Sequence, residues 1–445
     1  MSGGPYYLAR IANSIADIDN IEVYYTDYED GLHASIIKNS NIHLLIYNNE
    51  GGDFRIFPEE PVVVIMPIYW AHMVPKVHRQ TKIVFFNWHN ECIPVLKDEW
   101  IATDELISDF LELVSENDAE FFLDKAHWMA QKAYGKECKE RYVPIAIPPR
   151  KLKAEEELVE KDRRNIAVLG RLVQDKIYAV LDLVDSIIEL RDDVETNIYI
   201  IGEGDKEDLL FKKRIPSYIN LIECGTMAID DILILLAEKV DILFAMGTSV
   251  LDGASIGLPS AVLPNDMKAF RCNQYPFLNE VTGYALGWYP SQIEELEMET
   301  HSVKEIFELI YQKKQKKQIG VQCYKYYQAN HVDNVGLFLE AVENSQLTDE
   351  KYREFIKKSK SIRLFLRRLK YNLRRLYGRK THQLRLFGFP IYTITWSTDY
   401  HINIFILCIP LIRINKYENT IGIHFLPAIW FGKAIRKIIR RLKLK

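Results

Sequence analysis

The stretch Asn165-Ile166-Ala167-Val168-Leu169-Gly170-Arg171-Leu172 decides the fold that this 445-residue sequence predicts. Its first five residues are mostly apolar and end at a glycine, a pattern typical of a parallel strand that is buried on both faces. The same kind of run recurs, separated by longer segments of helical periodicity. We expect strands at 165–169, 197–201, 218–223, 241–245 and 259–263, and helices at 176–190, 230–239 and 249–256. Strands alternating with helices predict an open, doubly wound α/β sheet.

The first third of the chain repeats this alternation more loosely. Short apolar runs predict strands at 22–25, 42–47, 62–66 and 83–86, and a proline-rich stretch at 142–149 followed by charged residues marks a domain boundary. The sequence therefore predicts two Rossmann-like domains in tandem, 1–147 and 148–348, with a cleft between the carboxyl edges of their strands. A Gly3-Gly4 turn that leads into a helix at 6–16 normally follows a strand, so we expect a first strand to be missing ahead of it. A loose amino terminus is the alternative.

The net charge of −4 is the sum of two opposite and much larger charges. Residues 351–445 hold 23 Lys and Arg against 3 Asp and Glu, a net of +20, while residues 1–350 carry −24. With 48% hydrophobic residues the chain can bury a large core, which excludes the disordered and low-complexity classes. The 6 cysteines are scattered without a C-x-x-C pair, and the amino terminus does not resemble a signal peptide. These features predict a cytoplasmic protein with reduced cysteines.

Two cations follow the deciding strand. Arg171 lies just after it and Lys176 opens the next helix, so both should emerge at the carboxyl edge of the sheet. Arginine offers a bidentate fork and lysine a point charge, a pairing suited to one diphosphate. Surface cations beside a helix start are the alternative.

A second candidate is the turn at Gly247-Thr248-Ser249, where a strand leads into a helix. Glycine and two hydroxyl residues are typical of a helix N-cap, and the free N–H groups there favour an anion. Asp252 falls one turn later, where a carboxylate can accept hydrogen bonds from the two hydroxyls of a ribose. The alternative is a capped helix with one exposed aspartate.

Together these residues resemble the donor half of GT-B glycosyltransferases, particularly the bacterial enzymes that build surface polysaccharides and lipopolysaccharide. The resemblance rests on Gly170-Arg171-Leu172 with Lys176, on Gly202-Glu203-Gly204, on Gly225-Thr226, and on Ser249-x-x-Asp252 followed by Gly257-Leu258-Pro259. It implies that Arg171 and Lys176 hold the leaving diphosphate, that the turn at Gly225 and Thr226 meets the base, and that Asp252 binds the ribose. Gly247, Thr248 and Ser249 complete the implied donor site.

The resemblance extends to the first domain and has two departures. His89 resembles the histidine that family members point toward the donor sugar, and a histidine that only caps a strand or bonds a backbone carbonyl is the alternative. Gly3 and Gly4 resemble the glycine-rich turn that approaches the phosphates. Retaining members carry a glutamate eight positions before the Asp252 site, where this chain has Phe244, and Ile177 replaces the usual glycine after the lysine. We expect no metal site, because Asp17-x-Asp19, the one Asp-x-Asp in the sequence, lies in or just after a helix. The resemblance implies no cofactor other than the nucleotide-sugar substrate, since GT-B chemistry generally works with protein cations instead of a metal ion.

The basic tail, 349–445, begins with apolar residues spaced three and four apart from Tyr352 to Leu376, with lysines and arginines around them. Such a helix suits an anionic membrane surface. Packing on the acidic body, a coiled coil and nucleic acid are alternatives, the last without a recognised motif. Three proline-containing segments around Pro390, Pro410 and Pro427 form an irregular repeat, and the runs between them predict short β-hairpins. A second basic, amphipathic stretch ends the chain at 433–445.

The function that these features predict is a metal-independent hexosyltransferase of the bacterial cytoplasm, peripheral on the inner face of the cell membrane. It would move a sugar from a nucleotide-sugar donor to a lipid-linked or cell-envelope glycan, held on the membrane through 351–445, with no nucleic-acid partner. The alternatives are a catalytically silent GT-B-like protein that binds nucleotide or glycan, and a sugar-nucleotide epimerase.

Overall fold

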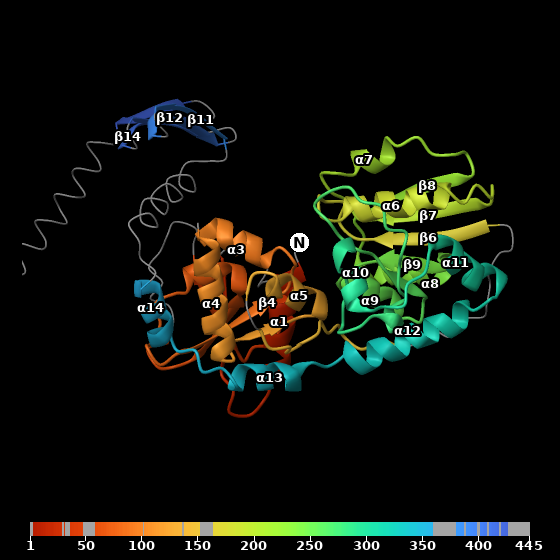
Figure 1. Ribbon diagram of the computed structural model, residues 1–445, viewed down its shortest axis with the longest axis horizontal. Coiled ribbons are helices and arrows are strands. Elements are labelled where there is room, and N and C mark those ends of the chain that lie inside the picture. The colour runs from red at the N-terminus through yellow and green to blue at the C-terminus, as the bar shows by residue number, and fades with distance from the viewer. Residues whose placement is uncertain are drawn as a thin grey trace, which may run out of the picture. The chain divides into compact units, whose positions relative to one another are not determined.

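The computed structural model describes residues 3–28, 31, 36–47, 58–100, 102–135, 138–151, 163–358, 380–386, 389–397, 401–406, 409–417 and 420–425. The chain forms two compact units: the first runs to Lys358, and the second holds Ser359–Lys445 together with Glu99–Ile101. Within the first unit, residues 3–143 form an N-terminal lobe and residues 163–330 a C-terminal lobe (Figure 1).

The N-terminal lobe contains two parallel sheets. One pairs β1 (Val23–Tyr28) with β2 (Ile42–Tyr47), and the other has the order β3 (Val63–Pro67), β4 (Lys82–Asn87), β5 (Glu120–Phe122). The helices of this lobe are α1 (Gly3–Ile15), the 3-10 helix η1 (Ile68–Met73), α3 (Cys92–Trp100), α4 (Asp104–Glu116) and α5 (Lys125–Lys132). The middle of β4 is fully buried, as expected for a parallel strand between two layers of helices.

The C-terminal lobe contains one parallel five-stranded sheet with the order β10-β9-β6-β7-β8. Its strands are β6 (Arg163–Leu169), β7 (Glu195–Ile201), β8 (Ile219–Gly225), β9 (Ile242–Ala245) and β10 (Ser260–Val262). Its helices include α6 (Ile177–Ile188), α7 (Asp208–Phe211), α8 (Ile229–Lys239), α9 (Thr248–Ala254), α10 (Ile293–Leu296), α11 (Val303–Phe307) and α12 (Lys316–Asn330). The strands β6, β7 and β8 lie side by side in Figure 1. The two parallel α/β lobes confirm the fold class predicted from the sequence.

After α12 the chain returns to the N-terminal lobe through α13 (Val335–Glu343) and α14 (Asp349–Lys358). Phe338 of α13 packs in the N-terminal core, edge-on to Phe121 with 6.0 Å between the ring centroids. The backbone N–H of Ile83 in β4 donates to the carbonyl of Leu347 at 2.8 Å, and the Ser345 hydroxyl donates to the carbonyl of Ile83 at 2.9 Å. The last helices of the unit are therefore part of the first lobe, although they follow the second in sequence.

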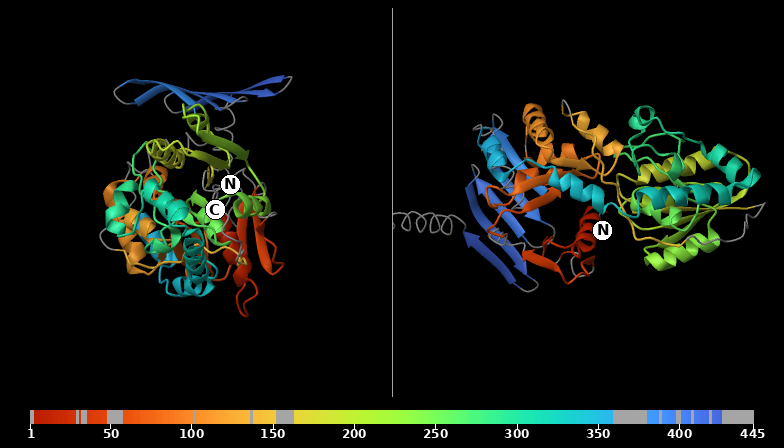
Figure 2. Two further views of the ribbon diagram at one scale, coloured as in Figure 1. Left: turned by 90° about the vertical axis from the view of Figure 1, so that its right-hand side faces the viewer. Right: turned by 90° about the horizontal axis from the view of Figure 1, so that it is seen from below.

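The described part of the second unit is a five-stranded antiparallel sheet, coloured blue in Figure 2. Its strands follow in chain order: β11 (Lys380–Leu386), β12 (Phe389–Ser397), β13 (His401–Ile406), β14 (Ile409–Tyr417) and β15 (Thr420–Phe425). They lie where the repeat predicts hairpins, and Pro390 and Pro410 are each the second residue of a strand. Of the predicted basic helix, α14 forms the first part. Residues 359–379, Pro427 and the basic stretch at 433–445 lie outside the described residues.

Candidate functional site

The candidate site lies at the carboxyl ends of β6 and β9. The chain runs from β6 outward through β7 and β8, then returns to place β9 on the other side of β6. Helices that follow the two directions cover opposite faces of such a sheet, which opens a crevice at the switch point where ligands of α/β sheets bind. Gly170 ends β6 and Met246-Gly247 ends β9, so the two turns flank this point.

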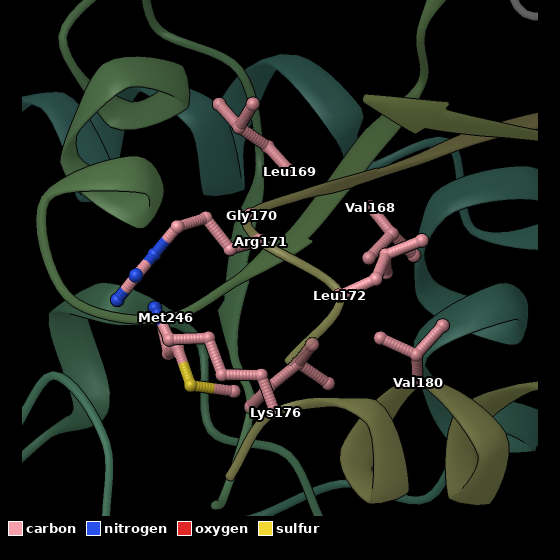
Figure 3. Close-up of a pocket in the computed structure, with 9 residues that line it drawn as sticks. Val168, Leu169, Gly170, Arg171, Leu172, Lys176, Val180 and Met246 are labelled. Atoms are coloured by element: carbon pink, nitrogen blue, oxygen red, sulfur yellow. The ribbon is translucent and has the colours of Figure 1, made fainter. Parts of the chain in front are cut away.

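A small pocket opens between these turns (Figure 3). Most of its lining is apolar, and Arg171 and Lys176 are its charged residues. The lining residues are Val168, Leu169, Gly170, Arg171, Leu172, Lys176, Val180, Met246 and Leu263. Figure 3 shows the guanidinium of Arg171 and the ammonium of Lys176 pointing toward one another beside Met246. The sequence-predicted pair of cations is therefore brought together in space.

The positive charge of the two cations is only partly offset, by Asp175 beside Lys176. Among the described residues, no side-chain hydrogen bond or ion pair is found for either one, and Arg171 is exposed. Burial lowers the pKa of Lys176, Arg171 lowers it further, and only Asp175 acts to raise it. A positive potential that costs free energy in the empty site becomes favourable when an anion binds there.

The glycines after β7 let the neighbouring strand ends lie close together. Gly202 has φ +125°, and a Cβ there would lie 2.2 Å from the carbonyl oxygen of Gly170. Gly170 N–H donates to the carbonyl of Ile201 at 3.0 Å, and Gly202 N–H donates to the carbonyl of Gly225 at 2.8 Å. These contacts align the turns after β6, β7 and β8. The backbone N–H of Thr226 donates to Glu203 at 3.1 Å, so the turn at Gly225 and Thr226 is held by the Gly202-Glu203-Gly204 segment.

Asp252, the predicted ribose ligand, already has a partner in this chain, and it is not the exposed aspartate of the alternative interpretation either. Its carboxylate accepts from Arg150 at 2.8 Å, and the same arginine nitrogen donates to the hydroxyl of Ser255 at 2.9 Å. Burial raises the pKa of Asp252, while Arg150 and then Arg10 oppose that rise. A ribose would therefore compete with an internal arginine for this carboxylate. Arg150 was missed from the sequence because it lies 102 residues away, in the proline-rich boundary.

The start of α9 differs from the predicted cap. Gly247 is the N-cap residue with φ +61°, its N–H donates to the carbonyl of Leu286 at 2.7 Å, and no side chain caps the helix. Thr248 and Ser249 are the first two helical residues, so the hydroxyls lie within the first turn. Phe244, the position where retaining relatives carry a glutamate, is fully buried in β9 and packs edge-on to Tyr275. A side chain at this position faces the core and not the crevice.

His89 lies across from the cations, in the turn after β4. Its Nδ1 accepts from the backbone N–H of Glu91 at 3.0 Å, so its proton is on Nε2. That nitrogen is 3.6 Å from the carboxylate of Asp175, the residue before Lys176. Burial raises the pKa of Asp175, but His89 and Lys176 more than offset this and hold it below its usual value. The two lobes thus meet beside the cation pair, through the contact of His89 with Asp175. The sequence analysis did not single out Asp175, although it directly precedes Lys176.

Further contacts join the lobes next to His89. The hydroxyl of Tyr289 in the C-terminal lobe donates to the carboxylate of Glu91. At the start of α5, Lys125 N–H donates to the carbonyl of Gly283 at 2.8 Å, and Gln292 donates to the carbonyl of Ala126 at 3.0 Å. These bonds fix the position of His89 relative to the C-terminal lobe.

An acid and a base are buried at the same junction. Asp124 caps α5 by accepting from the backbone N–H of His127, and burial raises its pKa to about 7. Burial lowers the pKa of His127 to about 3, helped by the nearby His89. His127 is therefore neutral at physiological pH, and its ring lies 3.1 Å from Asp124. Nothing in the sequence pattern singles out this pair.

The amino-terminal glycines and a group of acidic residues around His301 complete the comparison with the predicted site. Gly3 and Gly4 are the first residues of α1, so the segment predicted as a turn is helical. Within the described residues, Glu280, Glu299 and His301 form a group whose ligand atoms could hold a metal ion. His301 contacts both oxygens of Glu280 at 3.1 Å, which is also the geometry of a simple ion pair. No helix in the described part of the chain is long and apolar enough to cross a membrane.

No protein-family model matches the chain, and no curated protein matches it either. Solved structures do. One is the trehalose-6-phosphate synthase OtsA, with 12% identity over 77% of this chain and 95% of that one and a TM-score of 0.47. Another is WaaG, a glycosyltransferase involved in lipopolysaccharide biosynthesis, with 12% identity, 76% and 94% coverage and a TM-score of 0.43. A third is TarM, with 11% identity and a TM-score of 0.41.

The match to TarM covers 63% of this chain and 54% of TarM, so the chain spans about half the length of that protein. The matched structures include glycosyltransferases, the class that the resemblance in the sequence implies. At these identities and TM-scores the likeness concerns the fold alone, and what the site can do must be read from this chain's own residues.

Proposed function

We propose that this chain is a glycosyltransferase that transfers a sugar from a nucleotide-sugar donor to a glycan acceptor. The observation that carries the proposal is the convergence of Arg171 and Lys176 at the switch point of the C-terminal sheet, where Asp175 offsets only part of their charge. A nucleoside diphosphate fits this site, because its phosphates supply the negative charge that the pair lacks and the adjoining crevice can accept its nucleoside.

The geometry suits the departure of a diphosphate. When the bond between sugar and phosphate breaks, negative charge builds on the leaving oxygens. Arg171 and Lys176 are already turned toward one another, so little reorganisation is required as that charge develops. The Nε2–H of His89, held by Glu91 and directed to Asp175, presents a donor on the opposite side of the junction. Its role is to orient groups at the reacting centre, because Nδ1 is already occupied as an acceptor.

The finer part of the proposal concerns the acceptor and the location. A lipid-linked or cell-envelope glycan at the cytoplasmic face of the membrane is favoured by the net charge of +20 in residues 351–445, which suits an anionic lipid surface. We also propose that hexosyl transfer proceeds without a metal ion, with the two cations neutralising the leaving group. Activity should then survive treatment with a chelator.

A nucleotide-binding protein without catalysis is the second candidate, and two observations favour it. Phe244 is buried, so the position at which retaining relatives place a glutamate provides no sugar contact. Asp252 is already paired with Arg150. A protein of this kind would bind the nucleotide and leave the sugar unreacted.

The test is a thermal-shift screen of nucleotide diphosphates and nucleotide sugars, followed by assays of donor consumption with extracted lipid acceptors. Stabilisation together with sugar transfer supports the transferase. Stabilisation without donor turnover supports the silent binder, and conversion of the sugar without transfer identifies an epimerase. No response to any nucleotide, in a protein that unfolds cooperatively, contradicts all three.

A further inference from the structure

Four strands of the sheet in the second unit, β12 to β15, have one largely apolar and one largely polar face, as their register shows. Directly paired residues in an antiparallel sheet lie on the same face, and successive residues alternate between faces. One row crosses four strands as Trp396, Ile402, Ile414 and Ile423, and the next crosses them as Ile394, Ile404, Ile412 and Phe425. All eight positions of these two rows, called the apolar face, are large and apolar, and charged or polar residues lie at their margin, with Lys380 paired to Trp396, His382 paired to Ile394 and Lys416 paired to Ile421.

The opposite face has a different composition. One row runs Thr395, Asn403, Arg413 and His424, and another runs Ser397, His401, Asn415 and Gly422. Seven of these eight residues are polar, and the eighth is a glycine. A sheet of this pattern leaves its polar face in water and must bury its apolar face against something.

The register also explains the irregular proline repeat. Arg385 pairs with Pro390 and Phe405 with Pro410, and in both hairpins the register shifts next to this pair. A proline cannot donate to a neighbouring strand, so it is tolerated at a strand end or a bulge. The repeat is therefore a repeated hairpin whose alternation keeps the same face apolar across β12 to β15.

We propose that the apolar face is the surface by which this protein lies on an anionic lipid bilayer, an inference that rests on the proposed location of the transferase. Within residues 359–445, the structure describes strands alone. The sequence on both sides of the sheet is basic: 23 Lys and Arg against 3 acids over 351–445, with seven of the cations in the last thirteen residues.

The positive charge of the tail favours an anionic bilayer, and not a second copy of the chain, as the partner of the apolar face. Pairing two apolar faces would bring together two tails that each carry +20, and like charges at that density repel. An anionic leaflet attracts the flanking lysines and arginines while it receives the isoleucine rows. Trp396 at the edge of the apolar rows also suits the interface, where tryptophan is favoured.

Two substitutions at adjacent positions distinguish the effect of the apolar face on membrane binding from the effect of net charge. Ile404→Asp and Asn403→Asp each remove one unit of net positive charge from the tail, at neighbouring positions on opposite faces. In co-sedimentation of the full chain with vesicles of phosphatidylglycerol and phosphatidylcholine in equal parts, Asn403→Asp should weaken binding by about fivefold, the effect of one charge near the surface. Ile404→Asp should weaken it by at least about thirtyfold, because an apolar contact is also lost and a carboxylate is forced toward hydrocarbon. Equal losses in the two variants would overturn the proposal.

Because Ile404→Asp can also disturb the sheet, a second measurement uses the native fold. Phospholipids brominated on their acyl chains should quench Trp396, so Trp396→Phe should reduce the quenched fraction of the protein's fluorescence more than Trp88→Phe does. An unchanged quenched fraction in Trp396→Phe would show that another segment of the chain covers the face. A dimer in light scattering that Ile404→Asp dissolves would show that a second copy does.

The nucleotide response distinguishes this proposal from the proposed function. Position 404 belongs to the second unit and the cation pair to the first, so Ile404→Asp should keep any nucleotide-induced thermal shift. Vesicle binding without a nucleotide response would leave the membrane face standing and contradict the transferase.

Discussion

Removal of the cation pair should weaken diphosphate binding strongly and leave folding intact. The variant is Arg171→Met with Lys176→Met, which keeps much of each side-chain stem and removes both charges. A hydrogen bond to a charged group contributes about 1.5 to 3 kcal/mol. Loss of one such bond from each residue predicts about 3 to 6 kcal/mol, or roughly a hundredfold to ten-thousandfold weaker binding.

The effect on folding should have the opposite sign. Lys176 lines an apolar pocket, and burial lowers its pKa, so its charge is held at a cost. Methionine at this position removes a charge whose burial outweighs its attraction to Asp175, and it fills a similar volume, so the free energy of unfolding should be unchanged or higher by about 1 kcal/mol. A residue that served only structure would not give weaker binding together with equal or greater stability.

Calorimetric titration with pyrophosphate and with nucleoside diphosphates provides the assay, because pyrophosphate binding does not depend on the identity of the base. Lys206→Met is the matched control: it removes one cation of the same lobe, after β7, that pairs with Asp205 at 3.6 Å. This control should change the affinity by less than about threefold, since exposed charges interact weakly over distance. Binding by the double variant that equals that of the control would refute the assignment of the pair as an anion site.

The pH dependence of binding provides an independent check. The lowered pKa of Lys176 means that its ammonium loses its proton at a lower pH than an ordinary lysine does. Pyrophosphate affinity should therefore fall as the pH rises toward the alkaline range, and Lys176→Met should remove this fall. An identical alkaline profile in the wild type and in Lys176→Met would show that another group controls it.

Three further predictions concern the scaffold around the site. Gly202→Ala should lower the free energy of unfolding by about 2 to 4 kcal/mol in chemical denaturation, because its Cβ would lie 2.2 Å from the Gly170 carbonyl oxygen and φ is +125°. Gly336→Ala is the control and should cost nothing, because a Cβ added there meets no neighbouring atom within 4 Å. Arg150→Met should lower the free energy of unfolding by about 3 to 5 kcal/mol, because it removes the ion-pair partner of the Asp252 carboxylate. Adding Asp252→Asn should restore most of that free energy. If the second change restores none of it, the loss does not come from this ion pair. The hydrogen bond to Glu280 raises the pKa of His301. The contribution of protonated His301 to the stability of the fold is therefore complete below about pH 6.5 and is lost as the pH rises through the raised pKa. The melting temperature of His301→Gln should lack this decline with pH.

Much of the fold follows from local patterns. The strands that end at Leu169, Ile201 and Ala245 are short apolar runs, and parallel strands buried on both faces require this composition wherever they occur. Because every such strand ends at the same edge of its sheet, the meeting of Arg171 with Lys176 was also predictable. The hairpins of the tail followed from the runs between its prolines.

The contacts that change the chemistry of the site were not predictable in this way. Asp252 was predicted as a ribose ligand because its partner Arg150 is 102 residues away in sequence. The contact between His89 and Asp175 joins residues of different lobes, so spacing along the chain does not reveal it. The return of α13 to the first lobe depends on which core Phe338 enters, and apolar periodicity does not identify the partner of a helix.

By itself, the sequence determined the alternation of strands and helices, the edge at which the cations emerge and the separation of charge between body and tail, because these depend on residue type and on spacing along the chain. Tertiary structure alone decided which charges are neutralised and which are left for a ligand, and which residues of the tail share a face. Ion pairing depends on distance in space, and a face of a sheet depends on register, so neither can be read from residues taken in order along the chain.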